Sequence, residues 1–219
     1  MPRRALIEQR PWLLASLAAG ISFYFVTGSQ VPGLYQMAWK GAGVALLAVY
    51  ALVRGHSADS RQIAAVLAFG ALGDVLIELA QAWGAAAFLV GHLIAIQLYL
   101  RHRRAALSSS QKMTGIALVV LTPLIAWQLT ASLLVTVYAL GLGAMAASAW
   151  HSSFSRYRVG LGTVLFVASD LLIFAQTGLL AQNPLPGLLI WPLYYFGQFL
   201  ICIGVVGELK QRSRQGLPS

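Results

Sequence analysis

Residues Gly70–Ala80 read GALGDVLIELA, and they lie in an apolar segment, 62–80, that is long enough to cross a lipid bilayer. A charged side chain in hydrocarbon costs roughly 2.5–3.5 kcal/mol on insertion scales, so Asp74 and Glu78 in such a segment indicate a function. The two acids are four residues apart and share one face of a helix. We therefore expect that face to point into the interior of a helix bundle.

The composition is that of a membrane protein. Of 219 residues, 58% are hydrophobic and 10% are charged, whereas soluble domains carry more than twice that charged fraction. We expect an all-α fold, a polytopic bundle of eight transmembrane helices that forms a single membrane domain over residues 1–219. The expected helices cover about residues 11–28, 33–53, 62–80, 83–101, 112–128, 131–150, 157–178 and 186–207.

The basic residues predict the orientation of these helices. Of the 15 Lys and Arg residues, all but one lie at the two termini or in the links that follow the second, fourth and sixth helices. By the positive-inside rule, both termini are cytoplasmic, and we expect an integral protein of the bacterial inner membrane. Topology thus explains the net charge of +9, and no nucleic-acid partner is expected. These basic residues are Arg3, Arg4, Arg10, Arg54, Arg61, Arg101, Arg103, Arg104, Lys112, Arg156, Arg158, Lys210, Arg212 and Arg214.

Five ionisable residues remain inside the expected spans: Lys40, Asp74, Glu78, His92 and Asp170. With a rise of about 1.5 Å per residue, Lys40 lies roughly 10 Å and His92 about 14 Å below the outer face. Asp74 and Asp170 lie roughly 10–12 Å below the same face, and Glu78 lies nearer the surface. A common depth and the absence of water predict one polar pocket in the outer half of the bundle.

Neutral polar residues lie at a similar depth on two other helices. Tyr138 belongs to the sixth helix, and Tyr194 and Gln198 belong to the eighth, four residues apart. We expect these three side chains to supply hydrogen bonds in the same pocket. Phe69, Phe88, Phe166 and Leu172 are expected to line an apolar part of it that opens toward lipid.

Four segments around these residues resemble the recurring motifs of the YhhN family, the lysoplasmalogenases. They are LGDVLIEL (72–79), FLVGHLIAIQLY (88–99), GLGTVLFVASDLLI (160–173) and YYFGQFLI (194–201). Tyr138 and Met145, seven residues apart, are similar to a further pair of the family. The order and spacing of the motifs make the resemblance specific, and it covers nearly the whole chain.

The resemblance implies a membrane hydrolase that cleaves the vinyl ether of lysoplasmalogens to a fatty aldehyde and a glycerophospho-ethanolamine or -choline. The family's aspartates fall on Asp74 and Asp170, its histidine on His92 and its lysine on Lys40. The expected partners are therefore a lysophospholipid substrate and the lipids of the membrane.

The chemistry of a vinyl ether suits these residue types. Protonation of the β-carbon creates an oxocarbenium ion, and glycosidases stabilise a related ion with one protonated and one ionised carboxyl group. We expect Asp170 to be the acid and Asp74 the stabiliser or the base that activates water, although the reverse assignment is open. His92 is expected to relay a proton or to orient water. The expected substrate-binding residues are Lys40, Glu78, Tyr138, Tyr194 and Gln198.

Other functions stay open at this point. No cofactor is expected, and the single cysteine, Cys202, is interpreted as a packed thiol within the last span. A metal-dependent lipid hydrolase, with one divalent ion on Asp74, Glu78, His92 and Asp170, is one alternative. A small proton-coupled transporter is another, because intramembrane acids, lysine and histidine also mark ion pathways. A purely structural membrane protein is the third.

Overall fold

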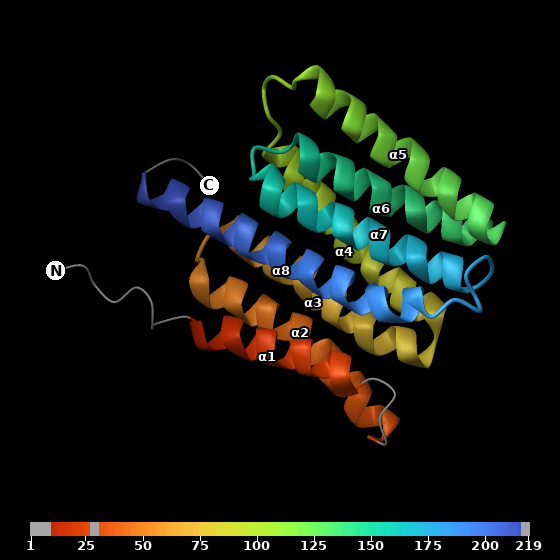
Figure 1. Cartoon of the computed structure of the whole chain (residues 1–219). Coiled ribbons are helices and arrows are strands. Elements are labelled where there is room, and N and C mark those ends of the chain that lie inside the picture. Colours follow the sequence, from red (N-terminus) through yellow and green to blue (C-terminus); the bar gives the residue numbers. More distant parts are fainter. Residues whose placement is uncertain (1–9, 27–30, 216–219) are drawn as a thin grey trace. The chain divides into compact units, whose positions relative to one another are not determined.

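The computed structural model describes residues 10–26 and 31–215 (Figure 1). These residues form eight α-helices and one turn of π-helix, and no strand is present among them. The elements are α1 (Arg10–Val26), α2 (Gly33–Arg54), α3 (Ala58–Leu79), α4 (Gln81–Arg101), α5 (Ser109–Thr130), α6 (Leu133–His151), the π-helix η1 (Arg156–Gly160), α7 (Leu161–Gln176) and α8 (Leu185–Arg214).

The helices have the length and composition that a bilayer requires. Seven of them, counting η1 and α7 as one, are long and apolar enough to cross a membrane, and α1 is apolar but shorter. The predicted all-α membrane fold of eight helices is therefore confirmed, and the protein is an integral membrane protein. That residues 1–219 form one domain stays a prediction. Arg3 and Arg4, which helped to predict the orientation, lie outside the described residues.

Polar caps extend several helices beyond their apolar spans. Helix α3 begins at Ala58 because the Ser57 side chain accepts a hydrogen bond from the backbone N–H of Ser60. Helix α5 begins at Ser109, where Ser108 and Gln111 form a capping box. At the other end of the chain, α8 runs on to Arg214 through polar turns. The length of an apolar run therefore does not predict where these three helices begin or end.

The described residues divide into two compact units, which we call the first unit (those within 1–91 and 206–219) and the second unit (His92–Val205). In the first unit, α1 packs on α2 and α2 on α3 (Figure 1). The Ser16 hydroxyl donates a hydrogen bond of 2.6 Å to the carbonyl of Gly43, which ties α1 to α2. A Cβ atom at Gly41 would lie 2.7 Å from a methyl group of Val75, so the small residue lets α2 and α3 approach closely.

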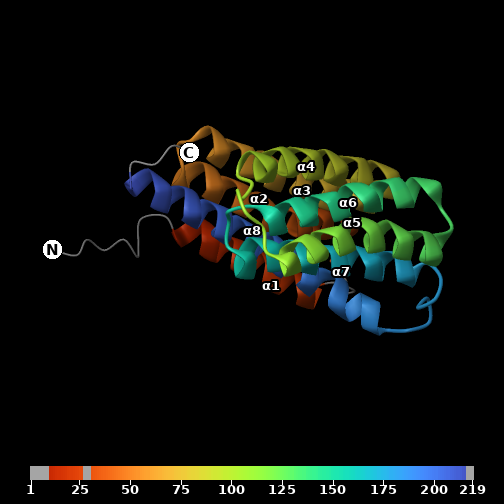
Figure 2. The same ribbon diagram turned by 90° about the horizontal axis from the view of Figure 1, so that it is seen from above.

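In the second unit, α5 and α6 pack side by side along their lengths, and both contact α7 (Figure 2). Helices α7 and α8 meet at two glycines, Gly162 and Gly197, because a Cβ atom on either would lie 2.7 Å from the carbonyl oxygen of the other. The Ser169 hydroxyl also donates to the carbonyl of Ile190 at 2.9 Å. These contacts fix the face of α7 that carries Asp170.

Candidate active site

Three buried polar side chains from three helices meet inside the second unit. The Tyr138 hydroxyl on α6 donates a hydrogen bond of 2.6 Å to Oδ2 of Asp170 on α7. The same hydroxyl oxygen lies 3.3 Å from Nε2 of His92 on α4. Asp170 is 6% exposed and His92 3% exposed, so water does not solvate either group fully. The Tyr138 hydroxyl therefore lies between His92 and Asp170 and contacts both.

The protons in this arrangement have a defined order. A tyrosine hydroxyl has one hydrogen, and Tyr138 gives it to Asp170. The contact between Tyr138 and His92 is then a hydrogen bond only when Nε2 of the imidazole carries a proton and donates it. All donors then point one way, from His92 through Tyr138 to Asp170.

Aromatic rings surround the three polar groups. The ring of Phe166 lies 5.1 Å, between centroids, from the imidazole of His92 and 5.1 Å from the ring of Tyr194. The ring of Phe174 lies 6.2 Å from that of Tyr138. In such apolar surroundings a hydrogen bond is electrostatically stronger than in water, and burying a polar group without a partner costs free energy. The hydrogen bond from Tyr138 therefore offsets part of the free-energy cost of burying the Asp170 carboxyl group.

Of the two side chains expected from α8, Tyr194 contacts the cluster. Tyr194 packs against Phe166 with its ring plane at 80°, an edge-to-face contact. Gln198 is buried one turn further along α8, at 2% exposure. Of the expected site residues, His92, Tyr138, Asp170 and Tyr194 thus belong to one cluster of contacts in this unit.

The remaining expected residues lie in the first unit. Nζ of Lys40 on α2 and Oε1 of Glu78 on α3 form an ion pair at 2.5 Å. The Lys40 side chain is 18% exposed and that of Glu78 is 45% exposed. Asp74 lies one turn before Glu78 on α3 and is buried, at 2% exposure. That Asp74 shares a pocket with Asp170 stays a prediction.

The sequence did not reveal every feature of the cluster. Phe174 was not expected at the site, although Phe166, Asp170 and Phe174 follow one another at intervals of four on one face of α7. Trp191, whose ring lies 5.7 Å from that of Tyr194, was also missed. The signal in the sequence is that Trp191 precedes the expected Tyr194 by three residues and so shares a face of α8 with it.

A possible metal site was among the alternatives. In the part of the chain that the structure describes, no three or more His, Cys, Asp or Glu side chains gather in a way that would hold a metal ion. The functional groups of the cluster are the carboxyl group of Asp170, the phenol of Tyr138 and the imidazole of His92.

A helical integral membrane protein with a buried aspartate, bonded to tyrosine and next to histidine, belongs to a recognisable class of polytopic proteins with an intramembrane polar site. More specifically, the chain belongs to the YhhN family, whose model matches residues 35–205. The resemblance noted in the sequence is thereby confirmed. Every expected site residue lies within the matched range.

Two curated relatives are similar to this chain over most of its length. Both carry the name lysoplasmalogenase, one from Mycobacterium bovis and one from Mycobacterium tuberculosis. Each is 27% identical over 210 residues, which cover 87% of this chain and 80% of the relative. No solved structure matches the chain significantly.

Proposed function

We propose that this protein is a membrane hydrolase that cleaves the vinyl ether bond of lysoplasmalogens to a fatty aldehyde and a glycerophospho-base. Membership of the YhhN family and the name of the two mycobacterial relatives support this activity. The single observation that carries the mechanism is the hydrogen bond from Tyr138 to the buried carboxyl group of Asp170. A buried acid in a membrane-spanning protein suits a substrate that is itself a lipid.

The reaction needs one proton and one water molecule. In the proposed mechanism, Asp170 gives a proton to the β-carbon of the vinyl ether, and the double bond becomes an oxocarbenium ion. Water adds to the carbon beside the ether oxygen and gives one proton to the base that activates it, proposed below to be Asp74, which leaves a hemiacetal. The hemiacetal then breaks its bond to the glycerol oxygen, so the products are the aldehyde and the free glycerol hydroxyl.

Tyr138 and His92 restore the acid in this proposal. After Asp170 has given up its proton, the Tyr138 hydroxyl passes its own hydrogen across 2.6 Å to the carboxylate. Nε2 of His92, 3.3 Å from the phenol oxygen, replaces that hydrogen, and Nδ1 of the same ring takes up a proton from water, so the imidazole stays neutral. Proton transfer between positioned groups of this kind contributes about 10²–10⁴-fold to a rate.

The residues of the first unit have proposed roles that follow from their charge and from the family motif. Asp74, in LGDVLIEL, is the stabiliser of the cation or the base that activates water. Lys40 and Glu78 bind the head group, because an ion pair offers a cation for the phosphate and a carboxylate for the ethanolamine or choline nitrogen. On α8, Tyr194 and Gln198 are proposed to contact the substrate.

The proposed location is the bacterial inner membrane, with both termini in the cytoplasm. The distribution of arginine and lysine over the termini and alternate links supports this orientation. In this orientation, the C-terminal ends of α2, α4, α6 and α8 lie on the cytoplasmic side of the membrane.

A proton-coupled carrier is the rival function, and one observation favours it too. A buried chain of His92, Tyr138 and Asp170 is also suited to move protons within a membrane. The carrier would bind its cargo without breaking a covalent bond. The formation of a fatty aldehyde therefore distinguishes the hydrolase from the carrier.

The experiment is an assay of the purified protein in detergent with a lysoplasmenyl lipid, without added metal. We expect free aldehyde to form, and we expect an ordinary acyl lysolipid to remain intact because its ester has no vinyl carbon to protonate. Aldehyde release that stops with EDTA and returns with a divalent ion would replace this mechanism with the metal-dependent one. No turnover of any ether or ester lipid, together with ion-dependent uptake into liposomes, would establish the carrier instead.

A further inference from the structure

The link between α4 and α5 contains a hollow with a strongly basic lining. Its volume is about 350 Å³, and it belongs to the second unit. Three of its lining side chains are cations and the others are small or apolar: Arg103, Arg104, Lys112, Ala105, Ala106 and Leu107. The candidate active site does not include any of these residues. The hollow therefore needs an explanation of its own.

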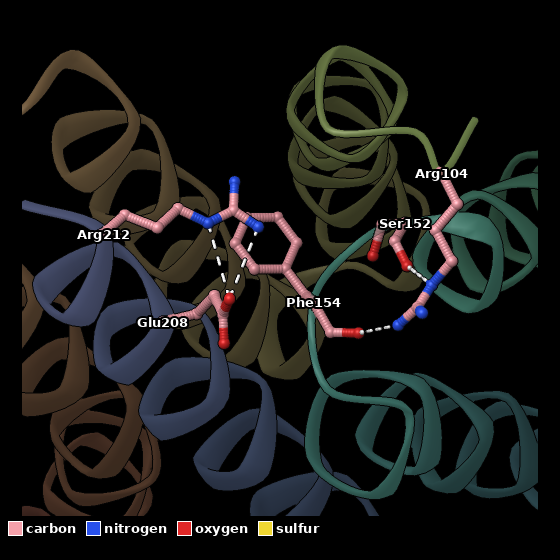
Figure 3. A network of polar contacts seen from close by, with 5 residues as sticks. All are labelled: Arg104, Ser152, Phe154, Glu208 and Arg212. Atoms are coloured by element: carbon pink, nitrogen blue, oxygen red, sulfur yellow. Dashed lines mark hydrogen bonds and ion pairs between the residues drawn. The ribbon is translucent and has the colours of Figure 1, made fainter. Parts of the chain in front are cut away.

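Arg104 is fixed in place by backbone carbonyl groups from the link after α6. Its Nε donates to the carbonyl of Ser152 at 2.7 Å, and Nη2 donates to that of Phe154 at 3.2 Å (Figure 3). Carbonyl oxygens satisfy the N–H groups but carry no full charge to neutralise the guanidinium. The structure thus holds a half-buried positive charge rigidly at the edge of the hollow.

The second unit does not contain a carboxylate that neutralises these cations. Between residues 92 and 205, Asp170 is the one acid in the sequence, and its buried carboxyl group accepts the hydrogen bond of Tyr138. The first turn of α5 has no acidic residue either, and Lys112 adds its charge close to the positive end of the helix dipole. Within the second unit, no carboxylate is therefore left to balance the three cations, which favours binding of an anion in the hollow.

The position of the hollow indicates which anion it takes. The link follows directly after α4 and precedes α5, two helices long and apolar enough to span a membrane, so it lies where the lipid head groups lie. Ala105, Ala106 and Leu107 offer apolar surface beside the cations. A small soluble anion would make no apolar contact with this surface. A phospholipid, in contrast, places its glycerol and first methylene groups beside its phosphate, where they can contact these side chains.

We propose that the hollow formed by Arg103, Arg104 and Lys112 binds the phosphate group of an anionic phospholipid. Basic clusters beside transmembrane helices attract anionic head groups, with about 1 kcal/mol per cation near the surface. The site is independent of the proposed hydrolase activity, because none of its residues takes part in that chemistry.

The test uses two double variants with the same loss of charge. Arg103→Gln with Lys112→Gln removes the two exposed cations of the hollow and leaves the hydrogen bonds of Arg104 intact. Arg156→Gln with Arg158→Gln is the control, since both arginines lie on η1 in the same unit and do not line the hollow. Native mass spectrometry would count the lipids retained by each detergent-purified protein during titration with phosphatidylglycerol or with phosphatidylcholine of the same chains.

We expect the first double variant to bind phosphatidylglycerol about 30-fold more weakly than the wild type, and the η1 control to bind it within about twofold. Phosphatidylcholine is expected to bind the wild type weakly. Equal losses in both double variants would overturn the proposal, because they would show attraction by overall charge alone. Displacement of phosphatidylglycerol by millimolar inorganic phosphate would overturn the assignment to a lipid and identify a site for soluble phosphate.

Discussion

Among single residues, the proposed mechanism depends most on Tyr138, whose hydroxyl lies between His92 and Asp170. The sequence predicts His92 and Asp170 as site residues because nearly all other charged residues lie at the helix ends, whereas these two lie inside apolar spans. Their link through Tyr138 was not predictable, because it depends on how α4, α6 and α7 are rotated about their axes. The sequence predicts that Tyr138 supplies a hydrogen bond in the pocket and binds substrate, but it does not identify Asp170 and His92 as the groups that the phenol contacts.

The variant Tyr138→Phe separates these two roles. If the phenol relays a proton to Asp170, its loss lowers kcat by roughly tenfold or more while KM changes little. A phenol that only binds substrate would raise KM and leave kcat unchanged, and that result would contradict the relay. Steady-state kinetics over several pH values gives both parameters, and a thermal melt compares the folded states.

The Lys40 and Glu78 pair offers a second test at this scale. The double variant Lys40→Glu with Glu78→Lys keeps an ion pair between α2 and α3 but reverses its direction. We expect its melting temperature to stay close to that of the wild type and its KM for lysoplasmenyl ethanolamine to rise severalfold, because phosphate then meets a carboxylate. A swapped variant with unchanged KM would show that the pair serves packing alone.

At the scale of helices, the sequence predicted the elements better than their ends and contacts. Long apolar runs require helices in a bilayer, so α2 to α8 follow from composition. Their ends follow from local polar contacts such as the Ser57 cap and the capping box at Ser108, which apolar length does not reveal. The contact of Gly162 with Gly197 pairs two distant segments, which no local pattern identifies.

This glycine contact makes a prediction about stability. Alanine at position 162 places a methyl group 2.7 Å from the carbonyl oxygen of Gly197, so Gly162→Ala is expected to destabilise the protein by about 1–3 kcal/mol. Gly187→Ala on α8 is the matched control, because nothing lies within 4 Å of its added Cβ and alanine favours a helix. Thermal unfolding in detergent measures both, and equal melting temperatures would contradict the close α7 and α8 contact.

For the whole molecule, the reactivity of single cysteines tests the proposed orientation in the membrane. After Cys202→Ala has removed the one native thiol, single cysteines at Asn183 and at Arg214 report on the two sides. In intact cells, a membrane-impermeant maleimide is expected to label the Asn183→Cys protein and not the Arg214→Cys protein, since arginine and lysine mark the cytoplasmic side. Labelling of Arg214→Cys alone would reverse the orientation.

The rate of aldehyde release by the Asp170→Asn variant tests whether Asp170 delivers the proton to the vinyl ether. Asparagine keeps the size of the side chain and an oxygen that accepts from Tyr138, but it has no acidic proton to give. Glu208→Gln is the control, because it makes the same chemical change at the polar end of α8. At saturating lysoplasmenyl lipid, and at equal folded fractions, we expect Asp170→Asn to lose about 10²–10⁴-fold in rate and Glu208→Gln to stay close to the wild type. A loss of less than about tenfold in Asp170→Asn would contradict the account, because a catalytic acid contributes more than that.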